Sequence, residues 1–194
     1  MSTLINPKSP IYIPSKGRWD SRMTAKALDK MEVPYHIVVE PQEYDKYAAV
    51  IDPAKILILP WSKPKSNTEL VPTRNWIWEH ALTTGAKRHW QLDDNIKMFW
   101  RLNKNRRFPV YTGAIFRAAE DFVDRYTNIA QAGFHYFMFA PSRCKMPPFV
   151  LNSRVYSCTM NLNSLPYRYR GIYNDDTDIS LRILKEKHIV VDDI

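Results

Sequence analysis

Two adjacent carboxylates follow an apolar segment near the middle of the chain, where Gln91-Leu92 leads into Asp93-Asp94-Asn95. Carboxylates at the end of a buried strand need a neutralising partner, and a divalent cation with hard oxygen ligands is one. The same cation could bridge a diphosphate leaving group. The alternative is an acidic turn that caps the next segment, because Asp and Asn favour turns. The pattern therefore favours a metal site that includes Asp93 and Asp94.

A second acidic group lies near the end of the chain, where Asp175, Asp176 and Asp178 precede an apolar helical pattern. A carboxylate that projects from a helix N-terminus towards a sheet edge can act as a general base for an acceptor hydroxyl. Carboxylates in a first helical turn also stabilise the helix dipole without any catalytic role, and Asp178 suits that role. Both roles stay open at this point.

A third candidate is the polar turn Ser15-Lys16-Gly17-Arg18, which follows the apolar segment Ile11–Pro14. A hydroxyl, two cations, a glycine and the free amides of a following helix together suit a phosphate or diphosphate. Strand, turn and helix combinations with Gly and Lys are also common without a ligand. The turn alone is therefore a weak signal.

The elements that position these residues are those of an α/β fold. The first 95 residues alternate short apolar segments with helical patterns, which is typical of βαβ units and a mostly parallel sheet. Ligands bind such sheets outside the carboxyl ends of the strands, where the turn and the Asp pair both lie. Strands are expected at 11–13, 35–40, 55–59 and 89–92, and helices at 23–31 and from Pro72 to Gly85.

The second half is less regular. Residues 97–109 are polar and basic without a clear period and are expected to form a surface loop. Residues 115–126 keep helical spacing of apolar side chains. Strands are expected at 135–140, 155–162 and 188–191, a helix at 179–184, and a Pro-rich connection at Pro141, Pro147 and Pro148.

Size and composition indicate one domain over residues 1–194, because a chain of this length with 45% hydrophobic residues can bury a full core. With only two cysteines and no CxxC pair, a disulfide framework or zinc site is not expected. No apolar stretch approaches the roughly 20 residues of a membrane helix. We therefore expect a cytoplasmic protein without a membrane span.

The net charge of +8 is concentrated in one block. Twelve of the 28 Lys and Arg residues, but only three of the 20 acidic residues, lie between Asn95 and Asn174. This asymmetry indicates a polyanionic partner. Phe99 and Trp100 lie among cations, a mixture typical of binding sites for single-stranded or flipped nucleotides, although a solvated basic loop with a tucked aromatic is the alternative. Candidate contacts to this partner are Lys97, Trp100, Arg101, Lys104, Arg106, Arg107, Arg168 and Arg170.

The order of these motifs resembles the GT-A glycosyltransferases, which have an Asp-x-Asp-type metal motif and a later Glu-Asp-x-Asp-Leu-x-Leu-Arg-type acceptor motif. Here the corresponding segments are Asp93-Asp94-Asn95 and Asp175-Asp176-Thr177-Asp178-Ile179-Ser180-Leu181-Arg182. The opening Ile-Pro-Ser-Lys-Gly-Arg and the compact size look like the bacteriophage TET-associated glycosyltransferases. Those enzymes are thought to decorate hydroxymethylated pyrimidines in DNA.

The resemblance implies a single GT-A-like domain whose residues 1–95 bind a nucleotide-sugar, UDP-linked, and whose residues 96–194 bind the acceptor. That acceptor would be a hydroxymethyl pyrimidine, such as hydroxymethylcytosine, in DNA. If the protein is viral, it would act in the host cell cytoplasm. Asp176 would be the base, with Asp175 beside it at a position where Glu is commoner. Mn²⁺ or Mg²⁺ would bind at Asp93, Asp94 and Asn95, the last a neutral ligand. Donor contacts are expected at Pro14, Ser15, Lys16, Arg18, Glu40, Arg74, Asp93 and Asp94.

Two alternatives remain. One is a glycosyltransferase that acts on a surface polysaccharide or a lipid-linked sugar, where the positive charge would meet phosphates or an anionic membrane. The other is a non-catalytic nucleic-acid-binding module with the same α/β shape. The acidic clusters at strand ends argue against the second, because they would repel DNA unless a metal covered them.

Overall fold

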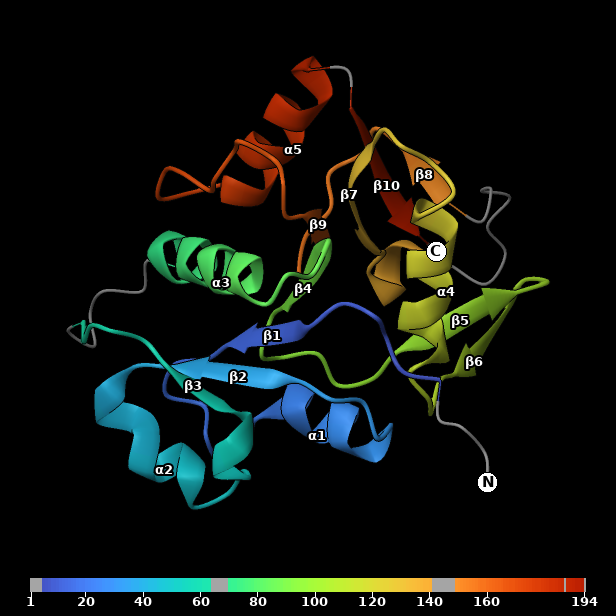
Figure 1. Cartoon of the computed structure of the whole chain (residues 1–194). Coiled ribbons are helices and arrows are strands. Elements are labelled where there is room, and N and C mark those ends of the chain that lie inside the picture. The colour runs from blue at the N-terminus through green and yellow to red at the C-terminus, as the bar shows by residue number, and fades with distance from the viewer. Residues whose placement is uncertain (1–4, 64–69, 141–148, 187, 194) are drawn as a thin grey trace.

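The chain has an α/β arrangement in which strands and helices alternate as far as residue 92 (Figure 1). The structure is a computed structural model that describes residues 5–63, 70–140, 149–186 and 188–193. The strands are β1 (Ile11–Pro14), β2 (His36–Val39), β3 (Ile56–Ile58), β4 (Arg88–Leu92), β5 (Trp100–Asn103), β6 (Arg106–Pro109), β7 (Ile129–Phe134), β8 (Phe149–Leu151), β9 (Cys158–Leu162) and β10 (Ile189–Asp193). The α-helices are α1 (Met23–Lys30), α2 (Tyr44–Ala48), α3 (Val71–Thr83), α4 (Ala114–Val123) and α5 (Asp175–Lys185), and short 3₁₀ helices are η1 (Pro41–Glu43), η2 (Pro53–Lys55) and η3 (Phe137–Phe139).

One eight-stranded sheet, in the order β3-β2-β1-β4-β9-β7-β10-β8, contains strands from both halves of the sequence. Within the described residues, every strand of this sheet runs in one direction except β9 and β8, which run the opposite way. The predicted α/β class with a mostly parallel central sheet is therefore confirmed. In the part of the chain that the structure covers, no helix has both the length and the apolar character needed to cross a membrane.

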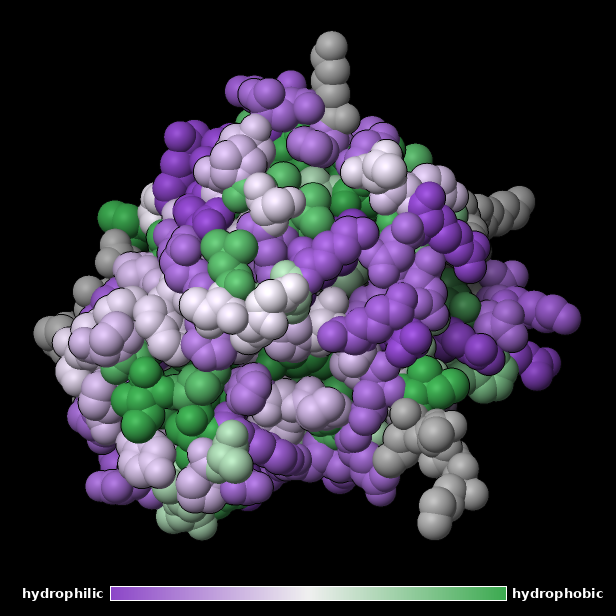
Figure 2. Space-filling view, in the orientation of Figure 1, coloured by the Kyte–Doolittle hydropathy of each residue, from purple (hydrophilic) through white to green (hydrophobic). Residues whose placement is uncertain are grey.

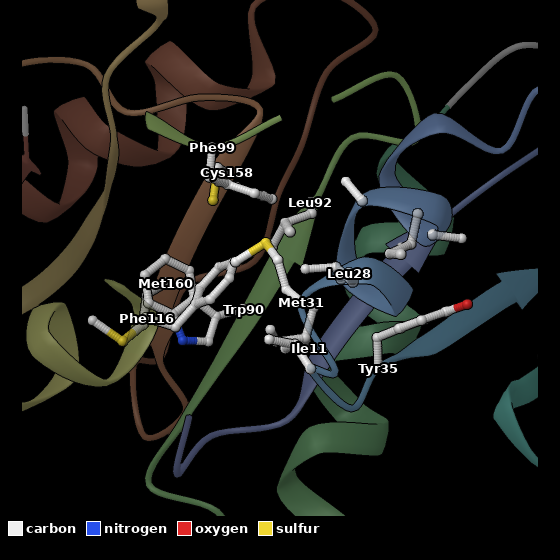
Figure 3. Packing of buried hydrophobic residues seen from close by; sticks show 14 of the residues in the cluster. Ile11, Leu28, Met31, Tyr35, Trp90, Leu92, Phe99, Phe116, Cys158 and Met160 are labelled. Carbon is white, nitrogen blue, oxygen red and sulfur yellow. The ribbon is translucent and has the colours of Figure 1, made fainter. Parts of the chain in front are cut away.

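The two faces of the sheet are covered by different helices. Ile11 and Ile13 of β1 belong to the cluster that packs against α1, α2 and α4, whereas Tyr12 between them belongs to a cluster with α3. This alternation follows from the two-residue period of a strand. Figure 3 shows the first cluster, in which Trp90 lies beside Phe116 and Met160.

The prediction of a surface loop over residues 97–109 is wrong, because β5 and β6 form a two-stranded hairpin in this segment. Its turn is Lys104-Asn105, with positive φ angles of 47° and 61°. Two residues with positive φ suit the type I′ turn, whose twist matches that of the flanking strands. The sequence lacks the usual Gly at this turn, and much of the hairpin is exposed on both faces, so no apolar alternation revealed it.

The prediction of a strand at 135–140 is also wrong, because this region contains η3. The strand is β7, which ends at Phe134 just before this region. The buried Gln131 interrupts the apolar pattern of β7, and its side chain is hydrogen-bonded to Asn161 and Ser180. Gly133 is required because a Cβ there would lie 2.2 Å from the carbonyl oxygen of Cys158. The strand predicted at 155–162 is β9, which begins later, at Cys158. Strand β8 was not predicted. The predicted Pro-rich connection lies outside the described residues.

Candidate active site

Polar side chains from neighbouring strands meet at the carboxyl edge of the sheet. Ser15 follows β1, Glu40 follows β2, and Asp93 follows β4, three strands that are adjacent in the sheet. Strand β9 runs antiparallel to β4, so its beginning lies at the same edge, and the amide of Asp93 donates to the carbonyl of Ser157 at 2.7 Å. The site predicted at the strand ends is therefore brought together by the sheet.

Asp94 holds the turn that follows β1. The Ser15 hydroxyl donates to one carboxylate oxygen of Asp94 at 2.8 Å, and the Arg18 guanidinium donates to the other at 2.7 Å. Burial raises the pKa of Asp94, and the contacts from Ser15 and Arg18 oppose that shift only in part. Asp94 is therefore a carboxylate whose charge the fold tolerates only with cationic or hydroxyl partners.

The other groups of this turn also face acids. Lys16 donates to buried Glu40 at 3.0 Å, and the Gly17 amide donates to Glu43 at 2.9 Å. Burial acts to raise the pKa of Glu40, but hydrogen bonds from the Lys63 amide, Lys16 and Gln42 outweigh it and lower that pKa. Pro14, just before the turn, is a buried strand residue paired with β2. A diphosphate at this turn would share Lys16 and Arg18 with Glu40 and Asp94.

Asp93 points away from this turn, towards β9. The Ser157 hydroxyl donates to Asp93 Oδ2 at 2.6 Å, and Ser157 in turn contacts the hydroxyl of Tyr136. Ser157 has a φ of 63° and lies at the centre of a γ-turn closed by the Cys158 amide and the Tyr156 carbonyl at 2.8 Å. A γ-turn with positive φ is strained, and such strain persists only where the surroundings enforce it. The strained backbone thus directs a hydroxyl at Asp93.

Arg74 joins the two acidic motifs. It comes from the first turn of α3, is only 5% exposed, and lies 3.5 Å from Asp93 and 3.4 Å from Asp175. Its Nη1 also donates to Asp176 Oδ1. Burial disfavours the charge on Arg74, but Tyr169 and the three carboxylates outweigh it and raise the pKa. The residue expected to contact the donor is therefore an internal cation between β4 and α5.

Asp176 combines burial with access. The pKa of Asp176 is raised to about 6, and burial is the largest cause. Asp175 and Asp93 also raise this pKa, whereas Arg74 lowers it. Arg74 occupies Oδ1, and no hydrogen bond from the described residues reaches Oδ2. A carboxylate with one anchored oxygen, one free oxygen and a pKa near neutrality is suited to accept a proton. Asp178, by contrast, is bound by Arg170 at 3.0 Å and Arg182 at 2.9 Å.

The carboxylates of this site fit a hard cation as partial ligands. Among the described residues, no three His, Cys, Asp or Glu side chains could enclose an ion by themselves. Asp93 is 30% exposed at its side chain, and exposed Asn95 lies two residues further on. Mg²⁺ is commonly held by one or two carboxylates together with substrate phosphates and water. Asp93, Asp94 and Asn95 offer that kind of incomplete set.

A comparison with known protein families matches residues 9–192 to the TET-associated glycosyltransferases. The chain belongs to this family. The match covers almost the whole sequence, so the protein is a glycosyltransferase, of a family that acts on modified DNA bases. None of the curated proteins matches the chain.

The acceptor residues expected in this TET-associated glycosyltransferase divide into two groups. Those on and before the β5–β6 hairpin are exposed: Lys97, Trp100, Arg101, Lys104 and Arg106. Arg107 instead donates to the carbonyls of Ala140 and Phe137 and stacks on the Phe137 ring at 3.9 Å. Phe99 is also not a contact residue, because it is buried in the core beside Cys158 (Figure 3). In Figure 2, hydrophilic residues dominate the side from which this hairpin projects.

Two later cations of the glycosyltransferase are engaged within the fold. Arg168 donates to Glu79 at 2.6 Å and to the carbonyls of Leu165 and Tyr167. Arg170 forms a bidentate pair with Asp178. Both contacts hold the segment before α5 in place, so these two residues have less freedom to meet DNA than those of the hairpin.

Three site residues of the glycosyltransferase were not found from the sequence. Ser157 donates to Asp93, and Tyr136 contacts Ser157. Tyr47 contacts the Ser15 hydroxyl at 2.6 Å and the Arg18 amide at 3.1 Å. All three belong to common residue types without a motif around them. Only the tertiary fold brings them to the strand ends.

Proposed function

We propose that this glycosyltransferase moves a sugar from a UDP-linked donor to the hydroxymethyl group of a modified pyrimidine in DNA, with a divalent metal at Asp93 and Asp94. The observation that carries the proposal is the convergence of Asp93, Asp175 and Asp176 on buried Arg74 at the carboxyl edge of the sheet. The candidate base Asp176 thereby shares one arginine with Asp93, which would be a metal ligand. A hydroxyl acceptor and a diphosphate leaving group need both.

In the proposed transfer, the acceptor hydroxyl oxygen forms a bond to the anomeric carbon of the sugar while the bond from that carbon to the diphosphate breaks. Asp176 Oδ2 takes the proton that the hydroxyl loses, and Arg74 holds Oδ1 so that Oδ2 keeps its direction. The metal would supply positive charge for the diphosphate. Lys16 and Arg18 would add to that charge from the turn after β1.

The acceptor side of the proposal rests on charge and exposure. Lys97, Arg101, Lys104 and Arg106 are exposed on one protruding segment, and the sequence contains no acidic residue from Asn95 to Ala119. A surface of this kind suits the phosphates of a nucleic acid. A polysaccharide acceptor without charge would gain nothing from it.

The first prediction concerns the metal. UDP should bind at least about tenfold more weakly in the presence of EDTA than with Mn²⁺ or Mg²⁺, because Asp93 and Asp94 would otherwise repel the diphosphate. Asp94→Asn should cause a loss of similar size with metal present, although the amide can still accept from Ser15. Isothermal titration calorimetry measures both. Asp45→Asn, which removes an exposed carboxylate of α2, is the matched control. Equal UDP affinity with and without chelator would remove the metal from the mechanism.

The second prediction concerns DNA binding. If about five cations contact phosphates, the logarithm of the association constant should fall with the logarithm of salt concentration with a slope of roughly −3.5 to −4.5. Lys104→Gln combined with Arg106→Gln should make that slope shallower by roughly 1.5. The control is Lys30→Gln combined with Lys185→Gln, which removes the same number of positive charges from α1 and α5 instead of the hairpin. This control should leave the slope unchanged. A wild-type slope near zero would instead favour an uncharged acceptor.

A further inference from the structure

A large cavity lies between the β5–β6 hairpin, α4 and the end of β7. Its volume is about 1010 Å³, and most of its lining is apolar or aromatic. Ligand pockets of drug-sized molecules have volumes of roughly 300–1,000 Å³, so this cavity can hold a nucleotide base together with its sugar. No step of the proposed transfer has yet used it.

The cavity adjoins the catalytic carboxylates. Asn95, Tyr136 and Ser157 all line it. Ser157 donates to Asp93, and Tyr136 contacts Ser157, so the wall of the cavity is hydrogen-bonded to the acidic site. A group bound inside the cavity would therefore lie one hydrogen-bonded side chain away from Asp93.

Aromatic rings on the cavity wall are unusually exposed. Trp100, Phe108, Tyr111 and Phe137 are between 38% and 65% exposed, and the rings of Trp100 and Phe137 lie 5.2 Å apart. Soluble proteins rarely expose contiguous apolar surface without a binding role. Flat aromatic faces beside cations are the surfaces on which unpaired bases stack.

The charge around the cavity favours a nucleotide over a lipid or an apolar peptide. Lys97 and Arg101 lie on its rim, and the hairpin turn adds Lys104 and Arg106 without any acid in the same segment. A phosphodiester backbone complements these cations while one base enters the aromatic interior. Enzymes that act on a base must take it out of the stack in this way.

One polar group inside the cavity has a buried carboxylate as its partner. His135 lines the cavity, and its Nδ1 is bound to the carboxylate of Asp192, which is only 2% exposed. A carboxylate partner keeps the proton on Nδ1, so in the neutral ring Nε2 is a hydrogen-bond acceptor. Cytosine offers an amino donor at position 4, whereas uracil and thymine offer a carbonyl acceptor there. In that neutral form, Nε2 would accept a hydrogen bond from the 4-amino group of a cytosine-type base.

We infer that this cavity receives the unpaired acceptor base of a DNA strand, stacked on Trp100, and that His135 selects a cytosine-type base through its 4-amino group. This inference rests on the proposed function in taking DNA as the acceptor. It adds the place where the base binds and the residue that distinguishes it from uracil.

The position of the base is tested by photocrosslinking, without any sugar donor. A single-stranded oligonucleotide with one 5-iodocytosine is irradiated with the full-length protein, and the crosslinked peptide is identified by mass spectrometry. Crosslinks should fall on Trp100, Tyr136 or Phe137. Trp100→Ala should weaken binding of the oligonucleotide roughly 5- to 100-fold. Tyr126→Ala, which removes an exposed aromatic after α4, should leave affinity unchanged. Crosslinks confined to residues outside the cavity would overturn the inference.

The role of His135 is tested by the ratio of affinities for two oligonucleotides that differ only in one base, hydroxymethylcytosine or hydroxymethyluracil. The wild type should prefer hydroxymethylcytosine by about 3- to 10-fold, since one neutral hydrogen bond differs. His135→Phe keeps a stacking ring and should abolish the preference while crosslinking persists. A preference that survives His135→Phe would exclude His135 as the selecting residue.

These binding results separate the two proposals. Crosslinks in the cavity without any sugar transfer would keep the base site and reject the proposed activity. Transfer to hydroxymethylated DNA with crosslinks elsewhere would keep the activity and reject the base site.

Discussion

Asp176→Asn should lower kcat by roughly 10²–10⁴-fold while UDP and metal binding stay close to those of the wild type. The amide keeps the shape of the side chain and can still accept from Arg74, but it cannot take a proton from the acceptor hydroxyl. Because burial raises the pKa of Asp176 to about 6, the ionised carboxylate is not favoured by the fold. The melting temperature of the variant at neutral pH should therefore not fall, which separates lost catalysis from lost folding.

The same pKa fixes the pH dependence of the wild type. A base must be deprotonated to act, so kcat/KM should rise as pH increases through about 6 and level off above it. This rising limb should disappear from the residual activity of Asp176→Asn.

Asp178→Asn is the internal control, since it alters a neighbouring acid of the same helix that pairs with Arg170 and Arg182. Its turnover should stay near that of the wild type, with a small loss of stability. Normal turnover in Asp176→Asn would mean that another group is the base or that the transfer proceeds with retention at the anomeric carbon.

The parts of the site that could be predicted are those set by strand ends. An apolar strand followed directly by Asp93-Asp94, and another followed by Ser15, must deliver these groups to one edge of a parallel sheet. The helix of Asp175 and Asp176 was also anticipated, because acids in a first turn mark a helix start. These inferences need only local sequence and the geometry of the α/β class.

The contacts between these groups could not be predicted, because they depend on tertiary placement. Arg74 lies in the first turn of α3, where a cation normally faces solvent, yet here three acids from two other elements enclose it. The hydroxyl of Ser157 reaches Asp93 only through a positive φ that the residue type does not suggest. The β5–β6 hairpin was missed for a related reason, since an exposed ribbon carries no apolar alternation to mark it.

Arg74→Met is the change expected to cost most in stability, about 3–5 kcal/mol at pH 8. Methionine fills a similar buried volume but leaves Asp93, Asp175 and Asp176 close together without their shared cation. Like charges in a buried site raise one another's pKa, so the acids of the variant can avoid the penalty only by binding protons. The deficit relative to wild type should therefore shrink as pH falls from 8 towards 5, where protonation of Asp176 removes part of the repulsion.

Urea unfolding of wild type and variant at pH 8 and pH 5 measures this difference directly. Arg117→Met is the matched control, because Arg117 makes an exposed i,i+4 pair with Asp121 and its loss should cost no more than about 0.5 kcal/mol at either pH. Arg74→Lys should fall between the two, since an ammonium keeps the charge but cannot reach three carboxylates with a planar fork. If Arg74→Met were as stable as wild type at pH 8, or if its deficit did not change with pH, the three carboxylates would not depend on Arg74. Asp176 would then need another group to orient it for proton transfer.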